Sequence, residues 1–416
     1  MRHVVELSKS ERTGPSERPG VPWRLIGPTV LVPNLLNSLG QSATITAVPL
    51  AASALTRSFA IAALVAALIT LGQLASTLPA GWVVDRFSER TAMVGSTAVT
   101  AVGGLLAYIG SSIPLLGLGA ALIGAGVSVF AMARHAWITV TVPVPVRGRT
   151  LSAVAGFTRL GNFLGPFLAA AAFHVSGRSE AAFLVVVGTS VGLLVLVAIA
   201  RFPESTTPTG DHGRQGVLGT LWNSRRTLFQ LGLTVSVISS MRTGRRVLVP
   251  LIGVSLGWDN VSTALLLGVT GALDFAVCYL GGSLVDRVGR IHVAVGTLVA
   301  FGLSHLAAAV ALVAPASDVV YIAAVAVMST ANGISGGLVP TIGSDLADPN
   351  APATFLSSWR LVTDAGGSVA PIAVAAFAGA LGLGSACLAM ALTASVAAGL
   401  LPRYARRHLR TRHPQP

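Results

Sequence analysis

The stretch GWVVDRFSER, residues Gly81 to Arg90, is a short charged turn between two long apolar segments, and GSLVDRVGR, Gly282 to Arg290, repeats it. Asp85 and Asp286 occupy the same place in the two turns and lie 201 residues apart in a chain of 416 residues. Self-similarity at a fixed spacing is typical of a repeated structural unit. The two turns therefore predict one membrane-embedded unit that the chain builds twice.

Composition also indicates an integral membrane protein. Hydrophobic residues make up 53% of the chain and charged residues only 10%, whereas about a quarter of the residues of a soluble protein are charged. The 46 glycines suit helices that approach one another closely in lipid. A net charge of +13 would suggest a nucleic-acid partner in a soluble protein. Here we expect no such partner, because the positions of the arginines are explained by membrane topology.

Twelve apolar stretches are long enough to cross a hydrocarbon core of ~30 Å, which takes about 20 helical residues. The predicted spans are 25–53, 60–82, 92–112, 115–138, 150–175, 180–200, 227–256, 262–283, 292–314, 318–345, 354–379 and 381–402. We therefore predict an all-α membrane fold of two six-helix bundles. Its parts are a disordered cytoplasmic tail (1–24), the first bundle (25–200), a cytoplasmic linker (201–226), the second bundle (227–402) and a basic cytoplasmic tail (403–416).

The basic residues of the tails and connections predict that both termini are cytoplasmic. Twenty of them fall on the side that holds the N-terminus, and two, Arg57 and Arg178, fall on the other. Cytoplasmic loops of membrane proteins carry the excess of Lys and Arg. We expect a monomeric, multi-pass protein of the inner or plasma membrane, surrounded by lipid.

The repeat continues beyond the charged turns. AVPLAASAL (Ala47–Leu55) aligns with LVPLIGVSL (Leu248–Leu256) at the same offset, and RLGNFLGPF (Arg159–Phe167) aligns with DAGGSVAPI (Asp364–Ile372) at an offset of 205. Two six-helix halves in the same orientation are the arrangement of transporters built from parallel repeats.

These features resemble the major facilitator superfamily, whose turn pattern Gly-x-x-x-Asp-Arg-x-x-Arg/Lys joins the second and third helices and returns between the eighth and ninth. The matching residues are Gly81, Asp85, Arg86 and, one position late, Arg90 in the first turn, and Gly282, Asp286, Arg287 and Arg290 in the second. The resemblance implies that these residues act in gating, by latching the two halves at the cytoplasmic side. Arg134, near the end of the fourth span, is a further candidate for that latch; simple anchoring at the membrane surface is the alternative for all of them.

The segment GNFLGPFLAA, in the fifth span, resembles the Gly-x-x-x-Gly-Pro motif of the proton-coupled drug antiporters of that superfamily. Gly161, Gly165 and Pro166 match the motif and are expected to act in helix packing, whereas Ala169 and Ala170 replace its usual glycine pair.

Several charged residues lie inside a predicted span, most of them about ten residues from its ends: Arg159, Arg242, Arg245, Arg246, Asp274, Arg360 and Asp364. A central charge costs at least ~2.5–3.5 kcal/mol, so it must face a cavity or a partner. In a two-half bundle that cavity is the cleft between the halves. The alignment places Gln41 over Arg242 and Gln73 over Asp274, so the second half carries most of the central charge.

We expect Asp274 and Asp364 to be candidates for proton coupling, although Asp364 could instead pair permanently with Arg360 four residues before it. The substrate-binding candidates are Arg242, Arg245, Arg159, Gln41, Gln73 and Arg360. No sequence pattern indicates a metal site, an ATP site or an enzyme active site, so we expect no cofactor and no enzymatic activity.

Together these residues predict a secondary active transporter that exports a small organic molecule in exchange for protons by alternating access. One alternative is an uptake symporter or facilitator for an organic anion or a sugar in the same fold. A more remote alternative is a membrane sensor that transports nothing.

Overall fold

The computed structural model describes residues 23–199, 219, 222, 224–347 and 352–409. Within these ranges the chain forms helices joined by short turns. The first half comprises α1 (Trp23–Ile26), the π-helical turn η1 (Gly27–Leu31), α2 (Val32–Leu55), α3 (Phe59–Phe87), α4 (Glu89–Ile109), α5 (Ile113–Thr141), α6 (Val144–Ser176), η2 (Ser179–Ala181) and α7 (Ala182–Ile199). Consecutive pieces α1, η1 and α2 form one rod, as do η2 and α7, so the half holds six rods.

The second half repeats this plan. It comprises α9 (Arg225–Thr227), the π-helical turn η3 (Leu228–Gly232), α10 (Leu233–Ser255), α11 (Asn260–Val288), α12 (Arg290–Ala311), α13 (Ser317–Ile334), the 3-10 turn η4 (Ser335–Gly337), α14 (Leu338–Leu346), α15 (Pro352–Leu381) and α16 (Leu383–Leu409). The pieces α9 to α10 form one rod and α13 to α14 another. The fold is therefore the expected twelve-helix bundle of two six-helix repeats.

The repeat is visible in the backbone as well as in the sequence. The two π-helical turns, 27–31 and 228–232, are 201 residues apart, and so are the starts of α3 and α11 and of α4 and α12. A single residue with a positive φ joins α3 to α4, Ser88 at 75°, and another joins α11 to α12, Gly289 at 92°. Only glycine adopts this conformation without strain, so the second turn is the relaxed copy of the first.

In the described part of the chain, nine helices are long and apolar enough to cross a membrane by length and composition. The three other long rods, 23–55, 144–176 and 225–255, contain α2, α6 and α10. Their lower hydropathy reflects polar and charged side chains, and all three contribute such side chains to the cavity described below.

Some boundaries differ from the sequence-based expectation. The helix α16 continues to Leu409, seven residues past the expected end of the last span, because the basic segment after residue 402 remains helical. The tenth rod is interrupted at Ser335–Gly337, where a 3-10 turn replaces α-helix. Most of the expected linker, residues 1–22 of the first expected tail and residues 410–416 of the second lie outside the described residues.

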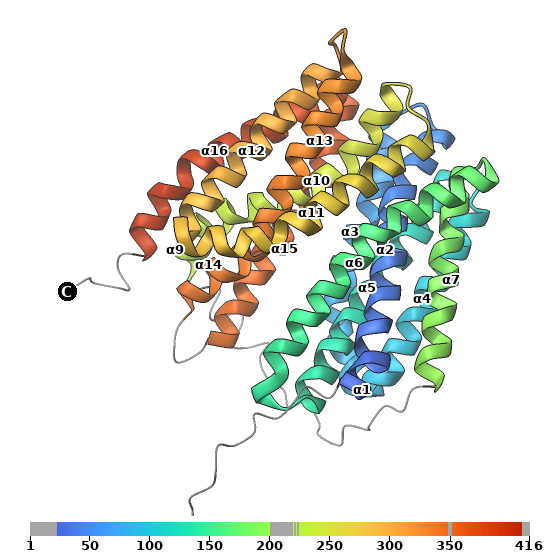
Figure 1. Ribbon diagram of the computed structural model, residues 1–416, viewed down its shortest axis with the longest axis vertical. Helices are drawn as coiled ribbons and strands as arrows, with labels where there is room; N and C mark the ends of the chain where they lie inside the picture. The colour runs from blue at the N-terminus through green and yellow to red at the C-terminus, as the bar shows by residue number, and fades with distance from the viewer. Residues whose placement is uncertain (1–22, 200–218, 220–221, 223, 348–351, 410–416) are drawn as a thin grey trace, which may run out of the picture.

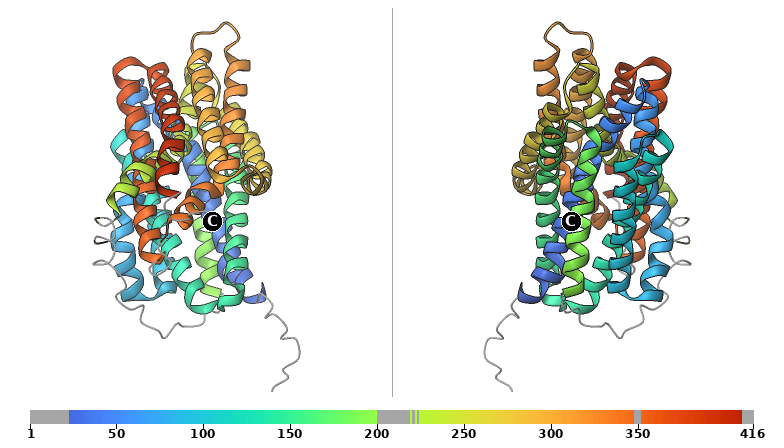
Figure 2. Two further views of the ribbon diagram at one scale, coloured as in Figure 1. Left: turned by 90° about the vertical axis from the view of Figure 1, so that its left-hand side faces the viewer. Right: turned by 90° about the vertical axis from the view of Figure 1, so that its right-hand side faces the viewer.

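The two halves lie side by side and meet at one end (Figure 1). There α2 packs against its counterpart α10, whereas α3 packs against α15 and α6 against α11. Toward the end that holds α1, α9 and α14 the two bundles spread apart (Figure 1). Within each bundle the long helices run beside one another along the length of the molecule (Figure 2).

Close helix packing in the first half depends on glycines of α6. A Cβ atom placed on Gly161 would lie 2.7 Å from Cβ of Ser38, and one placed on Gly165 would lie 2.6 Å from Cβ of Ser42. Both distances are shorter than normal carbon–carbon contacts, so α2 and α6 approach this closely only because the side chains are missing. Pro166, the next residue, is buried in the same helix. This contact fixes the position of two of the helices that form the site.

Candidate functional site

A cavity with an empty volume of about 900 Å³, its open mouth included, lies between the two halves. We call it the central cavity. Its lining comes from α2 and α6 of the first half and from α10, α11, α13 and η4 of the second. The lining residues with polar side chains are Ser42, Thr46, Arg159, Asn162, Arg242, Arg245, Arg246, Asp274 and Asn332.

Asp274 is the carboxylate of this cavity among the described lining residues, and Asn332 of α13 connects it to α10. The amide Nδ2 of Asn332 donates a hydrogen bond to Oδ2 of Asp274. The oxygen Oδ1 of Asn332 in turn accepts a hydrogen bond of 3.0 Å from Nε of Arg242. One neutral side chain thus bridges an arginine and an aspartate on two other helices.

Arg245 makes the second connection to Asp274. Its Nη2 lies 3.8 Å from Oδ2 of Asp274, and its Nη1 donates a hydrogen bond of 2.7 Å to Oγ of Ser329 on α13. The side chains of Arg245 and Asp274 are 15% and 26% exposed, so the cavity lets limited solvent reach the pair. Water around such a pair weakens its electrostatic attraction only partly.

Two further arginines reach the cavity without such partners. Within the part of the chain that the structure describes, neither Arg246 of α10 nor Arg159 of α6 donates a hydrogen bond to another residue. Arg159 crosses from the first half to the second: its Nη2 lies 2.6 Å from the point that a Cβ of Gly336 would occupy. The missing side chain at Gly336 therefore makes room for this guanidinium.

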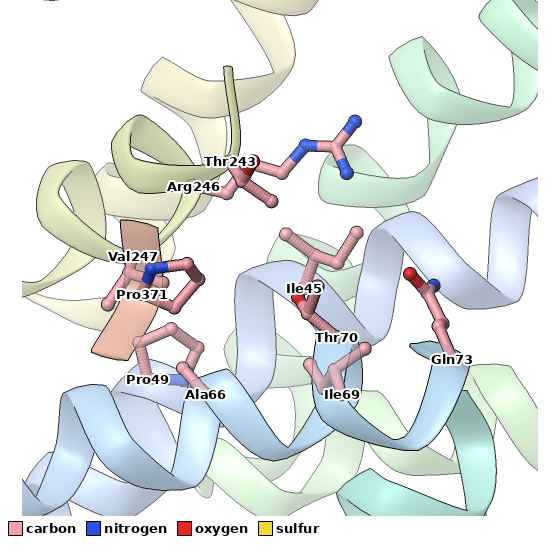
Figure 3. A pocket seen from close by; sticks show the side chains of 10 residues that line it. All are labelled: Ile45, Pro49, Ala66, Ile69, Thr70, Gln73, Thr243, Arg246, Val247 and Pro371. Atoms are coloured by element: carbon pink, nitrogen blue, oxygen red, sulfur yellow. The ribbon is translucent and has the colours of Figure 1, made fainter. Parts of the chain in front are cut away.

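A smaller, mostly apolar cavity adjoins the central one and shares Ile45 and Arg246 with it. Gln73 of α3 lies at its far side, and Pro49 and Pro371 of the two halves face each other across it (Figure 3). The guanidinium of Arg246 extends away from the two prolines (Figure 3). The structure therefore places Gln73 beside the interface of the halves, next to the charged cluster but not in it.

Three further expected site residues lie apart from the central cavity. Nε of Arg360 and Oδ2 of Asp364 form a pair at 3.3 Å on α15, with side chains that are 75% and 60% exposed, and neither residue lines the cavity. This is the local pair that the spacing allowed as an alternative. Gln41 of α2 is half-buried and is likewise absent from the cavity lining.

The contacts found for the two charged turns stay within one half. Nη2 of Arg90 donates hydrogen bonds of 3.1 and 3.3 Å to the carbonyls of Val197 and Ala198, at the end of α7. Nη1 of Arg290 forms an ion pair with Asp345 of α14. Of the other described charges of the turns, Arg86, Asp286 and Arg287 are exposed and Glu89 is buried. Gly81 is half-buried and Gly282 is exposed. The side chain of Asp85 lies outside the described residues.

Arg134, the further candidate for the latch, contacts helices of its own half in this structure. It is buried on α5, and its Nη1 donates a hydrogen bond to Oδ1 of Asn34 on α2. Nδ2 of Asn34 donates to the carbonyl of Val154 on α6 at 3.0 Å. In this structure Arg134 therefore ties three helices of the first half together.

Comparison with known proteins assigns the family. The family model of the Major Facilitator Superfamily matches residues 31–371. The chain belongs to this superfamily. Its membership places it among membrane transporters rather than enzymes, and the twelve-helix architecture agrees with that assignment.

The relatives compared with this chain are distant in sequence. An uncharacterized MFS-type transporter of Bacillus subtilis (strain 168), YdeG, is 26% identical over 295 residues, which are 64% of this chain and 66% of that protein. The nucleoside transporter NupG (D323A mutant) superposes with a TM-score of 0.75 at 11% identity, covering 90% of this chain and 98% of that one. The D-xylose–proton symporter gives 0.73 at 16% identity, covering 91% and 98%. At such identities the likeness to the solved structures shows the fold alone.

Sequence reasoning missed two neutral polar residues of the site. Asn332 and Ser329, which hold Arg242, Arg245 and Asp274 in one network, were not among the expected residues. Asn332 lies fifteen residues after the start of α13 at Ser317. A strongly polar amide so far inside a predicted span is the signal that could have identified it.

Proposed function

We propose that the chain is a secondary active transporter that moves a small organic solute through the central cavity by alternating access. The observation that carries this proposal is the network of Arg242, Asn332, Asp274 and Arg245 in a cavity between two structural repeats. The cavity is lined by both polar and apolar side chains, a combination typical of sites for small organic molecules. Charged groups buried in a membrane protein mark substrate and ion pathways.

Asp274 is the proposed proton acceptor. Its charge attracts Arg245 and receives the hydrogen bond of Asn332. Protonation removes that charge, so it weakens the attachment of α11 to α10 and α13 and frees the arginine for another anion. The network thereby gives the proton a means to change both the helix contacts and the solute site.

Gating is the proposed role of the two charged turns. They lie at the ends of α3 and α11 that are opposite to the α2–α3 and α10–α11 connections, where the bundles spread apart (Figure 1). If the arginine-rich side is cytoplasmic, the structure corresponds to an inward-facing state. Closure of that side would bring the turns toward the other half and form the latch.

The direction of transport depends on how proton and solute share the cavity. Export, the expectation from the α6 motif, requires the two to occupy the cavity in alternation. Uptake by symport requires them to occupy it together. Export and symport use the same helices, and the charges of the site decide whether proton and solute bind in alternation or together.

The experiment that tests the proposed function uses the full-length protein in proteoliposomes. Radiolabelled organic solutes are screened for accumulation driven by an imposed pH gradient, and the leading solute is then measured with Asp274→Asn and Arg242→Gln. We expect gradient-driven accumulation in the native protein and its loss in both variants. Unchanged accumulation in both variants would show that the cavity is not the transport site.

A further inference from the structure

Resting on the proposed function, we infer that the transported solute carries an anionic group, a carboxylate, sulfonate or phosphate, and that this group bridges Arg159 of the first half and Arg246 of the second. The central cavity supplies the observation: among its described lining residues, four are arginines and one is a carboxylate. Asp274 offsets one of the four positive charges and three remain.

The four arginines of the central cavity differ in whether their N–H groups already have hydrogen-bond partners. Arg242 donates a hydrogen bond to Asn332. Arg245 donates one to Ser329 and pairs with Asp274. Arg246 and Arg159, by contrast, donate no hydrogen bond within the described part of the chain. A guanidinium has five N–H donors in a fork that matches a carboxylate or a phosphate. Both guanidinium groups line the central cavity, one from each half, so they are its candidates for binding one anion.

A bound anion also favours closure of the two halves during alternating access. When the halves close, the arginines lose the water that now solvates them, and burial of unpaired like charges is unfavourable. An anionic group between Arg159 and Arg246 offsets that repulsion and joins the two halves. Closure around the loaded cavity is therefore easier than closure around an empty one.

The same charges determine how the proton and the solute interact. Protonation of Asp274 removes the one competing carboxylate and raises the net positive charge that the anion meets. It therefore increases the affinity for the anion, and by thermodynamic linkage the anion increases the affinity for the proton. Co-binding of this kind favours symport of proton and anion over the export by exchange expected from the sequence.

A thiol in the structure allows the positive field to be measured without a known substrate. Cys278 lies one helical turn after Asp274 on α11, and its Sγ is 3.6 Å from the point that a Cβ of Gly336 would occupy, next to the guanidinium of Arg159. Cys278 is half-buried, whereas Cys387, the other cysteine of the chain, is fully buried. Cys278 does not itself line the central cavity, but its thiol lies beside two residues that do, Gly336 and Arg159, so a reagent that reaches these two residues reacts at Cys278.

The experiment compares two reagents of opposite charge on the full-length protein, 2-sulfonatoethyl methanethiosulfonate and its trimethylammonium-ethyl counterpart. Each rate is divided by the rate with free 2-mercaptoethanol, and Cys278→Ala gives the background. We expect the anionic reagent to be favoured at least about tenfold, as in clefts lined by one sign of charge. Arg246→Gln and Arg159→Gln should each reduce that preference, whereas Arg246→Lys should keep most of it. Arg57→Gln, an exposed arginine between α2 and α3, is the matched control and should change nothing.

Equal normalised rates for the two reagents, or a preference that survives both glutamine variants, would overturn the anion site. In a second arm, benzoate should slow labelling of Cys278 by the anionic reagent more than neutral benzamide does at the same concentration, and equal slowing would contradict the proposal. Neither arm requires transport. A positive field with no gradient-driven solute movement would thus refute the proposed function alone, and movement of neutral solutes without such a field would refute the anion site alone.

Discussion

The guanidinium of Arg245 lies 3.8 Å from the carboxylate of Asp274, across the contact between α10 and α11 and inside the cavity that separates the two halves. The pair is neither fully buried nor open to bulk solvent. The pair also contacts α13 through Ser329 and Asn332, so a change in the charge of Asp274 alters contacts among α10, α11 and α13. The first half has Gln73 at the position of Asp274 and has no equivalent pair there.

Asp274→Asn should separate coupling from binding. The amide keeps the shape of the carboxylate but cannot take up a proton, so accumulation driven by a pH gradient should fall at least about tenfold, within the usual range of coupling between sites. Exchange of labelled for unlabelled solute at equal pH should persist. Asp364→Asn is the matched comparison, since its exposed pair with Arg360 contributes little. Retained gradient-driven accumulation in Asp274→Asn would refute its role as proton acceptor.

Asn332→Leu should destabilise the second half. The substitution removes the partner of Nε of Arg242 and one partner of Asp274, and leaving such groups unsatisfied costs about 1–3 kcal/mol. Thermal unfolding in detergent measures the change. Thr330→Val, two residues earlier on α13, is the control, because its hydroxyl bonds only the carbonyl of Ala326 in the same helix. Equal unfolding temperatures for the two variants would contradict the bridging role of Asn332.

Gly165→Ala should weaken the contact between α2 and α6. The added Cβ would lie 2.6 Å from Cβ of Ser42 and 2.8 Å from the carbonyl oxygen of Leu39, and overpacking of this kind typically costs about 1–3 kcal/mol. Gly156→Ala on the same helix meets nothing within 4 Å and should stabilise the protein slightly by restricting the unfolded chain. Unfolding curves of the two variants test the difference; a Gly165→Ala protein as stable as Gly156→Ala would exclude close packing here.

The two turn residues with positive φ should respond in opposite ways to substitution. Gly289→Ala places a Cβ on a backbone with φ of 92° and should cost about 1–3 kcal/mol. Ser88→Gly releases the same strain at φ of 75°, and it loses an exposed hydrogen bond of 3.2 Å to Oγ1 of Thr91 and a long cap contact of 3.5 Å from the amide of Thr91. Unfolding measurements should therefore show one variant below and the other at or above the native protein. Destabilisation by Ser88→Gly would mean that its hydroxyl matters more than its backbone.

The fold could be predicted from sequence because its signals are redundant. Each span is long and apolar, and the charged turns at Gly81–Arg90 and Gly282–Arg290 repeat at the offset that later relates η1 to η3 and α3 to α11. The break at Ser335–Gly337 has a local signal, since Gly336 and Gly337 are poor helix formers, but the predicted span of 318–345 ran through it.

The site could be predicted only in part, for a geometric reason. Counting residues along a span gives the depth of a side chain but not the direction in which it points. Depth alone grouped Arg360 and Asp364 with Arg242 and Asp274, yet the first pair is exposed on α15 and the second lies in the cavity. Asn332 escaped notice because a neutral amide costs less in a membrane than a charge and so attracts less suspicion.

The sign of the lumenal pH change on solute addition tests the central claim most directly. Proteoliposomes containing the native protein and a trapped pH-sensitive dye receive an anion that protects Cys278 from labelling, without any imposed gradient. Entry of the anion together with a proton predicts acidification of the lumen, which is lost in Asp274→Asn. Alkalinisation of the lumen, or acidification of equal size in Asp274→Asn, would contradict coupled transport of proton and anion through this cavity.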